Sequence, residues 1–232
     1  ISPRFVPVLD PGFVPAVLWT RAFREKVAAH PESRPFRLAM TRPTGFVAVH
    51  EGALLPATES VLNLKHVERL LKFLLWQKGG NRILIERAPD IAASLAATYA
   101  PGGARGFDQS YFGERTYDAP FSIEAVDSVP EANEGAMALG RHLEGCRIGF
   151  DLGGSDRKAA AVIDGKVVFS EEVPWDPYFE SNPQYHLDGI RDSLKRAAEH
   201  LPRVDAIGGS AAGVYVDNEV KGADESWDKT VE

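Results

Sequence analysis

The chain has 232 residues, of which 44% are hydrophobic and 25% charged, the ordinary range for soluble globular proteins. Its formal net charge of −7 argues against a nucleic-acid partner, because proteins that bind the phosphate backbone normally carry a basic face. No stretch is long and apolar enough to span a bilayer, so no membrane partner is expected. The single cysteine, Cys146, cannot form an internal disulfide, which favours a cytoplasmic protein.

The first 145 residues show alternating helical and strand-like patterns. Asn63 is expected to be the N-cap of the clearest helix, and residues 101–120 show no regular period. The expected elements are a helix over 14–29, strands over 36–40 and 46–50, a helix over 64–75, a strand over 82–86, a helix over 91–99, a strand over 121–126 and a helix over 130–143. Helix, buried strand and helix in this order predict a small α/β domain over residues 1–145, of unknown role, with a parallel crossover.

The segment from 105 to 117 alternates aromatic with charged side chains. Such a loop could line a sugar face or a domain interface by stacking, and packing against its own domain is the favoured alternative.

Residues 146–173 carry the most informative pattern in the chain. Apolar runs over 148–152, 158–163 and 166–173 predict three antiparallel strands. Asp164-Gly165 separates the last two, and Asp-Gly between such runs is typical of a type I′ hairpin turn.

The turn between the first two of these strands has the composition of a phosphate and metal site. Gly153 and Gly154 lack a β-carbon, so their amides can approach an anion, while Ser155 and Lys158 add a hydroxyl and a charge. Asp151 would repel a phosphate directly and would instead position a hydrated Mg²⁺ through water. The alternative is an ordinary Gly-Gly hairpin with a capping aspartate.

A helix over 186–201 and a strand over 204–207 follow. The helix is expected to cross over the sheet, so that this strand lies parallel to the strand that ends at Asp151. A loop of small residues over 208–213 would then lie at the same end of the sheet as Asp151 and share a ligand with it.

The segment GFDLGGSDRKAAAVIDGKVVFSEE resembles the first phosphate-binding hairpin of the sugar kinase, heat-shock ATPase and actin superfamily. It is most similar to the ROK family of bacterial sugar kinases and sugar-responsive repressors. Ser155 stands where that family usually has Thr. Residues 204–217 are similar to the family's Gly-x-Gly-x-Pro-Gly-x-Val-Asp loop, with Ala212 in place of Pro. The resemblance covers residues 146–221.

The resemblance implies that residues 146–221 form the first lobe of an actin-like (ribonuclease H-like) ATPase domain, apparently incomplete, with 222–232 as a polar tail. The implied activity is phosphorylation of a sugar hydroxyl, with ATP and Mg²⁺ as cofactors and a sugar or sugar-like molecule as partner. Gly153, Gly154, Ser155 and Lys158 would bind ATP, and Asp151 the metal. The substrate side would comprise Ser210, Gly213, Asp217 and Asn218.

No catalytic Asp, second phosphate loop or adenosine-binding segment of that family is recognisable after Asp151. The chain is therefore expected either to be a fragment or to lack the activity. We expect a missing second lobe or a homo-oligomeric partner to cover apolar sheet surface. Two alternatives remain: a sugar-responsive transcriptional regulator, which would need a DNA-binding helix-turn-helix, and a catalytically silent sugar-binding or scaffold protein.

Overall fold

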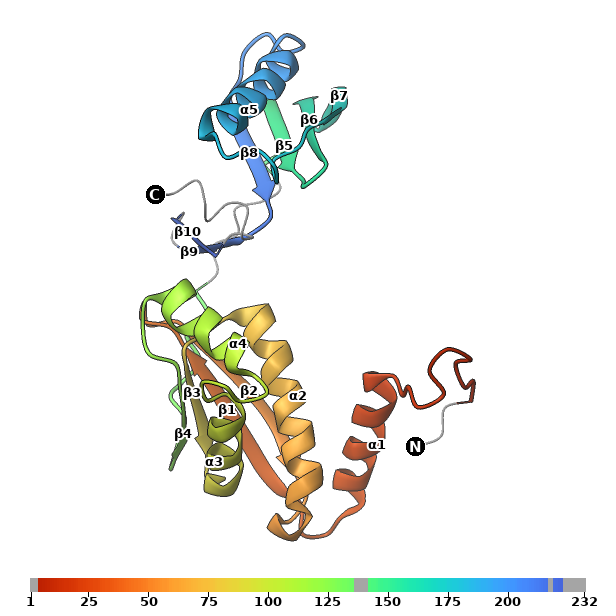
Figure 1. Cartoon of the computed structure of the whole chain (residues 1–232), viewed down its shortest axis with the longest axis vertical. Helices are drawn as coiled ribbons and strands as arrows, with labels where there is room; N and C mark the ends of the chain where they lie inside the picture. The colour runs from red at the N-terminus through yellow and green to blue at the C-terminus, as the bar shows by residue number, and fades with distance from the viewer. Residues whose placement is uncertain (1–3, 136–141, 217–218, 223–232) are drawn as a thin grey trace. The chain divides into compact units, whose positions relative to one another are not determined.

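The structure, a computed structural model, describes residues 4–135, 142–216 and 219–222 (Figure 1). The chain is of the mixed α/β class and divides into two compact units, residues 1–136 and 137–232. This division precedes residue 145, where the sequence patterns placed the boundary. No helix of the described parts is both long and apolar enough to cross a membrane.

The N-terminal unit is built on a four-stranded sheet in the order β2-β1-β3-β4. Strand β1 pairs antiparallel with β2 and β3, whereas β3 and β4 are parallel, which confirms the predicted hairpin and parallel crossover. Its elements are α1 (Ala16–Ala29), β1 (Arg34–Thr41), β2 (Val47–Leu54), η1 (Ala57–Glu59), α2 (Ser60–Lys78), β3 (Arg82–Glu86), α3 (Pro89–Thr98), α4 (Gly106–Ser110), η2 (Tyr111–Arg115) and β4 (Ser122–Val126).

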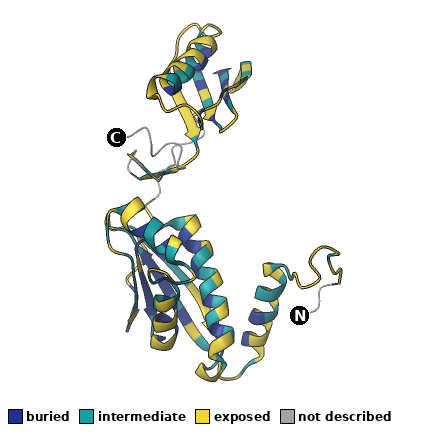
Figure 2. Cartoon of the chain, viewed as in Figure 1, coloured by how far each residue is buried: buried dark blue, intermediate teal, exposed yellow. Residues whose placement is uncertain are grey.

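The main core of this unit lies between the sheet and helices α1, α2 and α3 (Figure 2). Apolar residues recur at helical spacing along α2, so one side of the helix buries Val67, Leu71, Leu74 and Leu75. A smaller cluster, which includes Ala39, Leu84 and Val129, lies apart from this core. Since neighbouring residues of a strand point to opposite faces, Ala39 and Leu38 belong to different clusters.

Three expectations for this unit are wrong. Asn63 is not an N-cap, because α2 begins at Ser60 and Asn63 lies buried within it. The segment expected to be irregular contains α4 and the π-helix η2, which place Phe107 and Tyr111 in stacking contact with Trp76. Residues 130–135 and 142–143 are not helical, and the rest of the helix expected over 130–143 lies outside the described residues.

The C-terminal unit contains a four-stranded sheet in the order β7-β6-β5-β8, with a separate β9-β10 pair. Asp164 and Gly165 both have positive φ, 47° and 79°, as the predicted type I′ turn requires. The elements are β5 (Cys146–Leu152), β6 (Asp156–Ile163), β7 (Lys166–Pro174), α5 (Pro183–Ala198), β8 (Ala206–Ala211), β9 (Val214–Val216) and β10 (Glu219–Gly222).

Strand β8 lies parallel to β5, as expected for a strand that follows a crossover helix. It extends to Ala211, however, so most of the segment predicted as a loop over 208–213 is strand. The glycines at 208 and 209 therefore lie inside the sheet rather than beyond it.

Helix α5 covers one face of this sheet. Its Ala197 packs with Ile148, Ala159 and Ala161 in a small core. Arg157 of β6 also reaches the helix, where its guanidinium donates to Gly189 O at 2.6 Å, to Asp192 Oδ2 at 2.9 Å and to Ser193 Oγ.

No described element lies on the opposite face of the β5–β8 sheet, which we call the open face. Alternation along the strands places Gly149, Asp151, Lys158, Gly208 and Ser210 there, and all five are exposed. Three of the predicted site residues, Asp151, Lys158 and Ser210, lie on this face, and the glycine turn follows β5 directly.

Candidate functional site

Asp151 and Ser210 lie side by side near the carboxyl ends of two parallel strands. They are register partners on β5 and β8, and Ser210 Oγ donates a hydrogen bond to Asp151 Oδ1. Both residues are exposed. The structure thus brings together the predicted metal residue and one predicted substrate residue, which are 59 positions apart in the chain.

A groove of about 830 Å³ runs over the open face at this point. A β-carbon added at Gly149 or Gly208 would meet no atom within 4 Å, so a ligand can approach the backbone at both positions. The groove is lined by Gly149, Phe150, Asp151, Lys158, Ala159, Ala160, Ser170, Glu171, Glu172, Gly208, Gly209 and Ser210.

The glycine turn after β5 is held from one side by Trp175. The indole Nε1 donates to Gly153 O at 2.7 Å, and the Trp175 amide donates to Ser155 O at 3.1 Å. The Gly153 amide is itself engaged, donating to Asp156 O at 2.9 Å, so it is not free for an anion as the sequence suggested.

Gly154 is the more accessible of the two glycines. It is exposed, as is Ser155, and their amides have no acceptor within the described parts of the chain. A β-carbon at Gly154 would lie 2.5 Å from Tyr178 Cε2. The close packing of Tyr178 is therefore a second reason, besides ligand access, for glycine at this position. The turn therefore offers two amides to solution and is not covered.

Asp156 is the site residue that the sequence reasoning missed. Ser155 Oγ donates to Asp156 Oδ2 at 2.9 Å, and Lys158 Nζ bonds to Asp156 Oδ1. These bonds lower the pKa of the Asp156 carboxyl, and the bond to Asp156 raises the pKa of the Lys158 ammonium. Its position in the sequence could have revealed it. Asp156 begins β6 two residues before Lys158, and residues two apart in a strand point to the same face of the sheet.

Gly213, the next predicted substrate residue, does not line the groove. It lies in the bend between β8 and β9, with φ at 134°. Asp217 and Asn218 lie outside the described residues.

Charges of both signs meet on the open face. Lys158 opposes Asp151 across β5 and β6, and its Nζ lies 3.9 Å from Glu172 Oε2 on β7. Where the chain is described, no group of three or more His, Cys, Asp or Glu side chains is placed to hold a metal ion. A metal here would therefore need oxygens from water or from the ligand to complete its coordination. Mg²⁺ is commonly bound in this way.

Comparison with known proteins assigns no family. No protein-family model matches the chain, and no curated protein matches it.

Proposed function

We propose that the C-terminal unit is the first lobe of an actin-like ATPase domain, that its groove binds the phosphates of Mg·ATP, and that the parent reaction phosphorylates a sugar hydroxyl. The strand order supports this proposal. Three antiparallel strands, a crossover helix and a fourth strand parallel to the first give the order β7-β6-β5-β8, the arrangement expected of a ribonuclease H-like lobe.

The observation that carries the proposal is the pairing of Asp151 with Ser210 beside an exposed glycine turn. Ligands of open α/β sheets bind at the carboxyl ends of parallel strands, which is where both residues lie. The exposed carboxylate of Asp151, beside the amides of Gly154 and Ser155, suits a hydrated metal that bridges to phosphate oxygens. Lys158 lies on the same face, with Asp156 and Glu172 as its other carboxylate neighbours.

Each residue then has a defined task. The amides of Gly154 and Ser155 would donate to phosphate oxygens, and Lys158 would exchange its bond to Asp156 for one to phosphate. Asp151 would orient water on Mg²⁺, which supplies charge neutralisation when bound. Ser210 holds Asp151 in place, because its hydroxyl bonds to the carboxylate.

Binding of Mg·ATP to the whole chain, measured by isothermal titration calorimetry, tests the proposal. We expect heat of binding, and we expect Asp151→Asn to weaken Mg·ATP binding about tenfold or more while binding of metal-free ATP changes less. Asp188→Asn is the control: it removes the same charge from an exposed residue of α5 and should leave binding of Mg·ATP unchanged.

The proposal would be contradicted if the chain did not bind Mg·ATP. It would also be contradicted if Asp151→Asn bound Mg·ATP as tightly as the unchanged chain does. Absence of binding would favour a catalytically silent sugar-binding or scaffold protein. The regulator alternative has less support, because β3 separates α2 from α3 and joins the sheet, which is not a helix-turn-helix.

The open face and its exposed strands also lead us to propose that a second lobe or a second copy of the chain covers this surface. The buried, unpaired thiol of Cys146 fits the proposed cytoplasmic location.

A further inference from the structure

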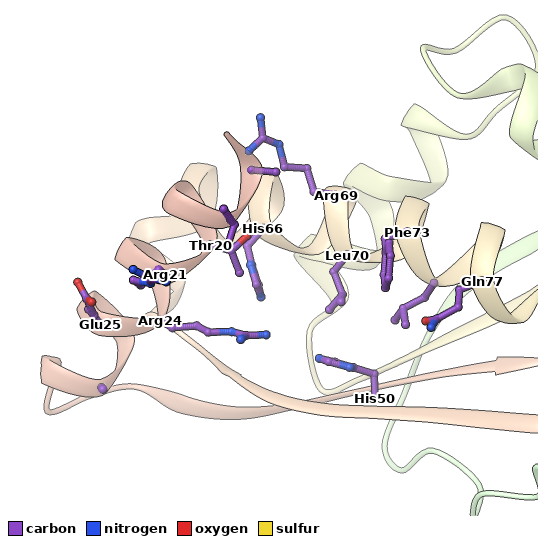
Figure 3. A pocket seen from close by; sticks show the side chains of 14 residues that line it. Thr20, Arg21, Arg24, Glu25, His50, His66, Arg69, Leu70, Phe73 and Gln77 are labelled. Atoms are coloured by element: carbon purple, nitrogen blue, oxygen red, sulfur yellow. The ribbon is translucent and has the colours of Figure 1, made fainter. Parts of the chain in front are cut away.

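A second pocket, of about 860 Å³, lies wholly within the N-terminal unit. Its walls are α1, α2 and the adjoining part of β2 (Figure 3). A pocket of this size is in the range that holds small-molecule ligands. We call it the α1–α2 pocket.

The charges that line the α1–α2 pocket are mostly positive. Arg21, Arg24 and Arg69 stand against a single carboxylate, Glu25, although the whole chain has a net charge of −7. None of the three arginines forms an ion pair with a described carboxylate. Arg69 lies over the Trp19 ring at 5.3 Å, and Glu25 points away from the pocket (Figure 3). Arg24 is the arginine whose side chain extends from α1 toward α2 and β2 (Figure 3).

Arg24 meets two histidines from other elements. Figure 3 shows its side chain extending from α1 toward His66 of α2 and His50 of β2, whose rings point toward it. Burial, followed by the charge of Arg24, lowers the pKa of His66 to about 4 and lowers that of His50 as well. Both rings are thus neutral near pH 7 and add hydrogen-bonding groups beside one fixed positive charge.

The wall next to these groups is apolar. It is formed by Leu70, Phe73 and Leu74 of α2 and by Val17 and Ala28 of α1. Phe73 is 62% exposed, so its ring is available to a ligand in the pocket. A charged end and an apolar wall in one pocket fit a ligand that has the same two parts.

We propose that the α1–α2 pocket binds a small organic anion whose carboxylate or phosphate group contacts Arg24, His50 and His66 and whose apolar body lies against Leu70, Phe73 and Leu74. The anion compensates the unpaired guanidinium, and its apolar body covers Phe73. This site is separate from the Asp151 groove, and the inference does not depend on the proposed function.

Calorimetric titration of the whole chain with four probes tests both halves of the inference. Octanoate and octyl phosphate carry the charge and the apolar body, whereas acetate lacks the body and octanol lacks the charge. We expect octanoate, octyl phosphate or both to bind, and acetate and octanol to bind at least about tenfold more weakly. The stronger of the first two identifies the head group as carboxylate or phosphate.

Arg24→Gln should weaken binding of the charged probe about tenfold or more. Lys195→Gln, which removes an exposed positive charge on α5, should have no effect. Circular dichroism and thermal unfolding of Arg24→Gln check that its loss of binding is not a loss of folding.

The histidines supply a second readout. Because the positive charge of Arg24 lowers the His66 pKa, a bound anion should raise that pKa, and octanol should not. The NMR signals of the His66 ring, followed against pH with and without octanoate, measure this change. Failure of both charged probes to bind, equal binding by Arg24→Gln, or a His66 pKa that does not rise at saturation would each overturn the inference.

Discussion

At the scale of single residues, Asn63 and His66 show how much a helix position depends on its neighbours. They lie three residues apart in α2, and the sequence pattern predicted that Asn63 is the N-cap of this helix. In the structure Asn63 is buried, accepts from Leu55 N at 3.0 Å and donates to Leu55 O at 3.0 Å. It thereby satisfies the backbone of the segment that connects β2 to α2.

Replacing Asn63 by Ala should lower the free energy of unfolding by about 2–4 kcal/mol, because it leaves the Leu55 amide and carbonyl buried without partners. Urea denaturation measures this loss. Asn133→Ala is the control, since Asn133 also donates to a backbone carbonyl, that of Gly45 at 2.9 Å, but is exposed. Equal losses in the two variants would contradict the role given to Asn63.

His66 makes stability depend on pH. Its pKa falls from 6.5 to about 4 in the folded chain, mainly through burial. Well above pH 6.5 the ring is neutral in both the folded and the unfolded chain, so it has no effect on stability. As the pH falls toward 4 the unfolded chain binds a proton that the folded chain does not, so stability is lost. We expect a loss on the order of 1 kcal/mol at pH 5, since part of the ring remains in water.

Urea denaturation at pH 7 and pH 5 measures that loss. In His66→Gln the difference between the two pH values should be smaller, although the variant is less stable overall because the ring stacks on Phe23 at 4.3 Å. An unchanged difference would show that other groups cause the pH dependence.

At the scale of elements, β8 contains two adjacent glycines with opposite surroundings. Gly208 faces the open groove, whereas Gly209 lies under the ring of Phe150 on β5. A β-carbon at Gly209 would lie 2.1 Å from Phe150 Cζ. The strand's alternation therefore puts one glycine at the ligand face and the other in packing contact with β5.

Gly209→Ala should destabilise the C-terminal unit by about 1–2 kcal/mol, because Phe150 must move to admit a methyl group. Gly208→Ala should be neutral or stabilising by up to about 1 kcal/mol, because the added methyl group meets nothing and the unfolded chain loses freedom. Thermal unfolding of both variants compares them, and the reverse ranking would contradict the placement of the ring.

At the scale of the whole molecule, each cluster of buried apolar residues lies within one of the two compact units. The clusters that contain Leu38 and Ala39 lie in the first unit, and the cluster around Ile148 lies in the second. Destabilising substitutions should therefore act on the unit that contains them.

Hydrogen exchange measured by mass spectrometry on the full chain tests this separation. Asn63→Ala should speed amide exchange in β1–β4 and leave β5–β8 unchanged, and Gly209→Ala should do the opposite. Faster exchange throughout the chain in either variant would show that the units unfold together.

Local patterns in the sequence predicted many of the elements. The Asp164-Gly165 turn follows from its need for positive φ at both positions, and the amphipathic run after His186 predicted α5 to within a few residues. The order of three antiparallel strands, a helix and a parallel strand followed from these signals together with the handedness of crossovers.

Predictions failed where contacts with residues outside a segment decide its conformation or the role of its side chains. Asn63 has a capping side chain, but its partners are the amide and carbonyl of Leu55, eight residues earlier in the connection that follows β2. A helix was predicted over 130–143, yet near the start of this run Asn133 forms a β-bridge with Val47 of β2. Helix propensity is weak and yields to such contacts.

By itself, then, the sequence determined the identity of the turns, the periodicity of the elements and the glycine-rich segment beside Asp151, because these depend on neighbouring residues. Only the tertiary structure decided that Ser210 bonds to Asp151, that Asp156 engages Ser155 and Lys158, and that no described element covers one face of the β5–β8 sheet. It also decided that Arg24, His50 and His66 meet in one pocket. Contacts of this kind depend on how strands and helices pack against one another, and the spacing of residues along the chain does not reveal that packing.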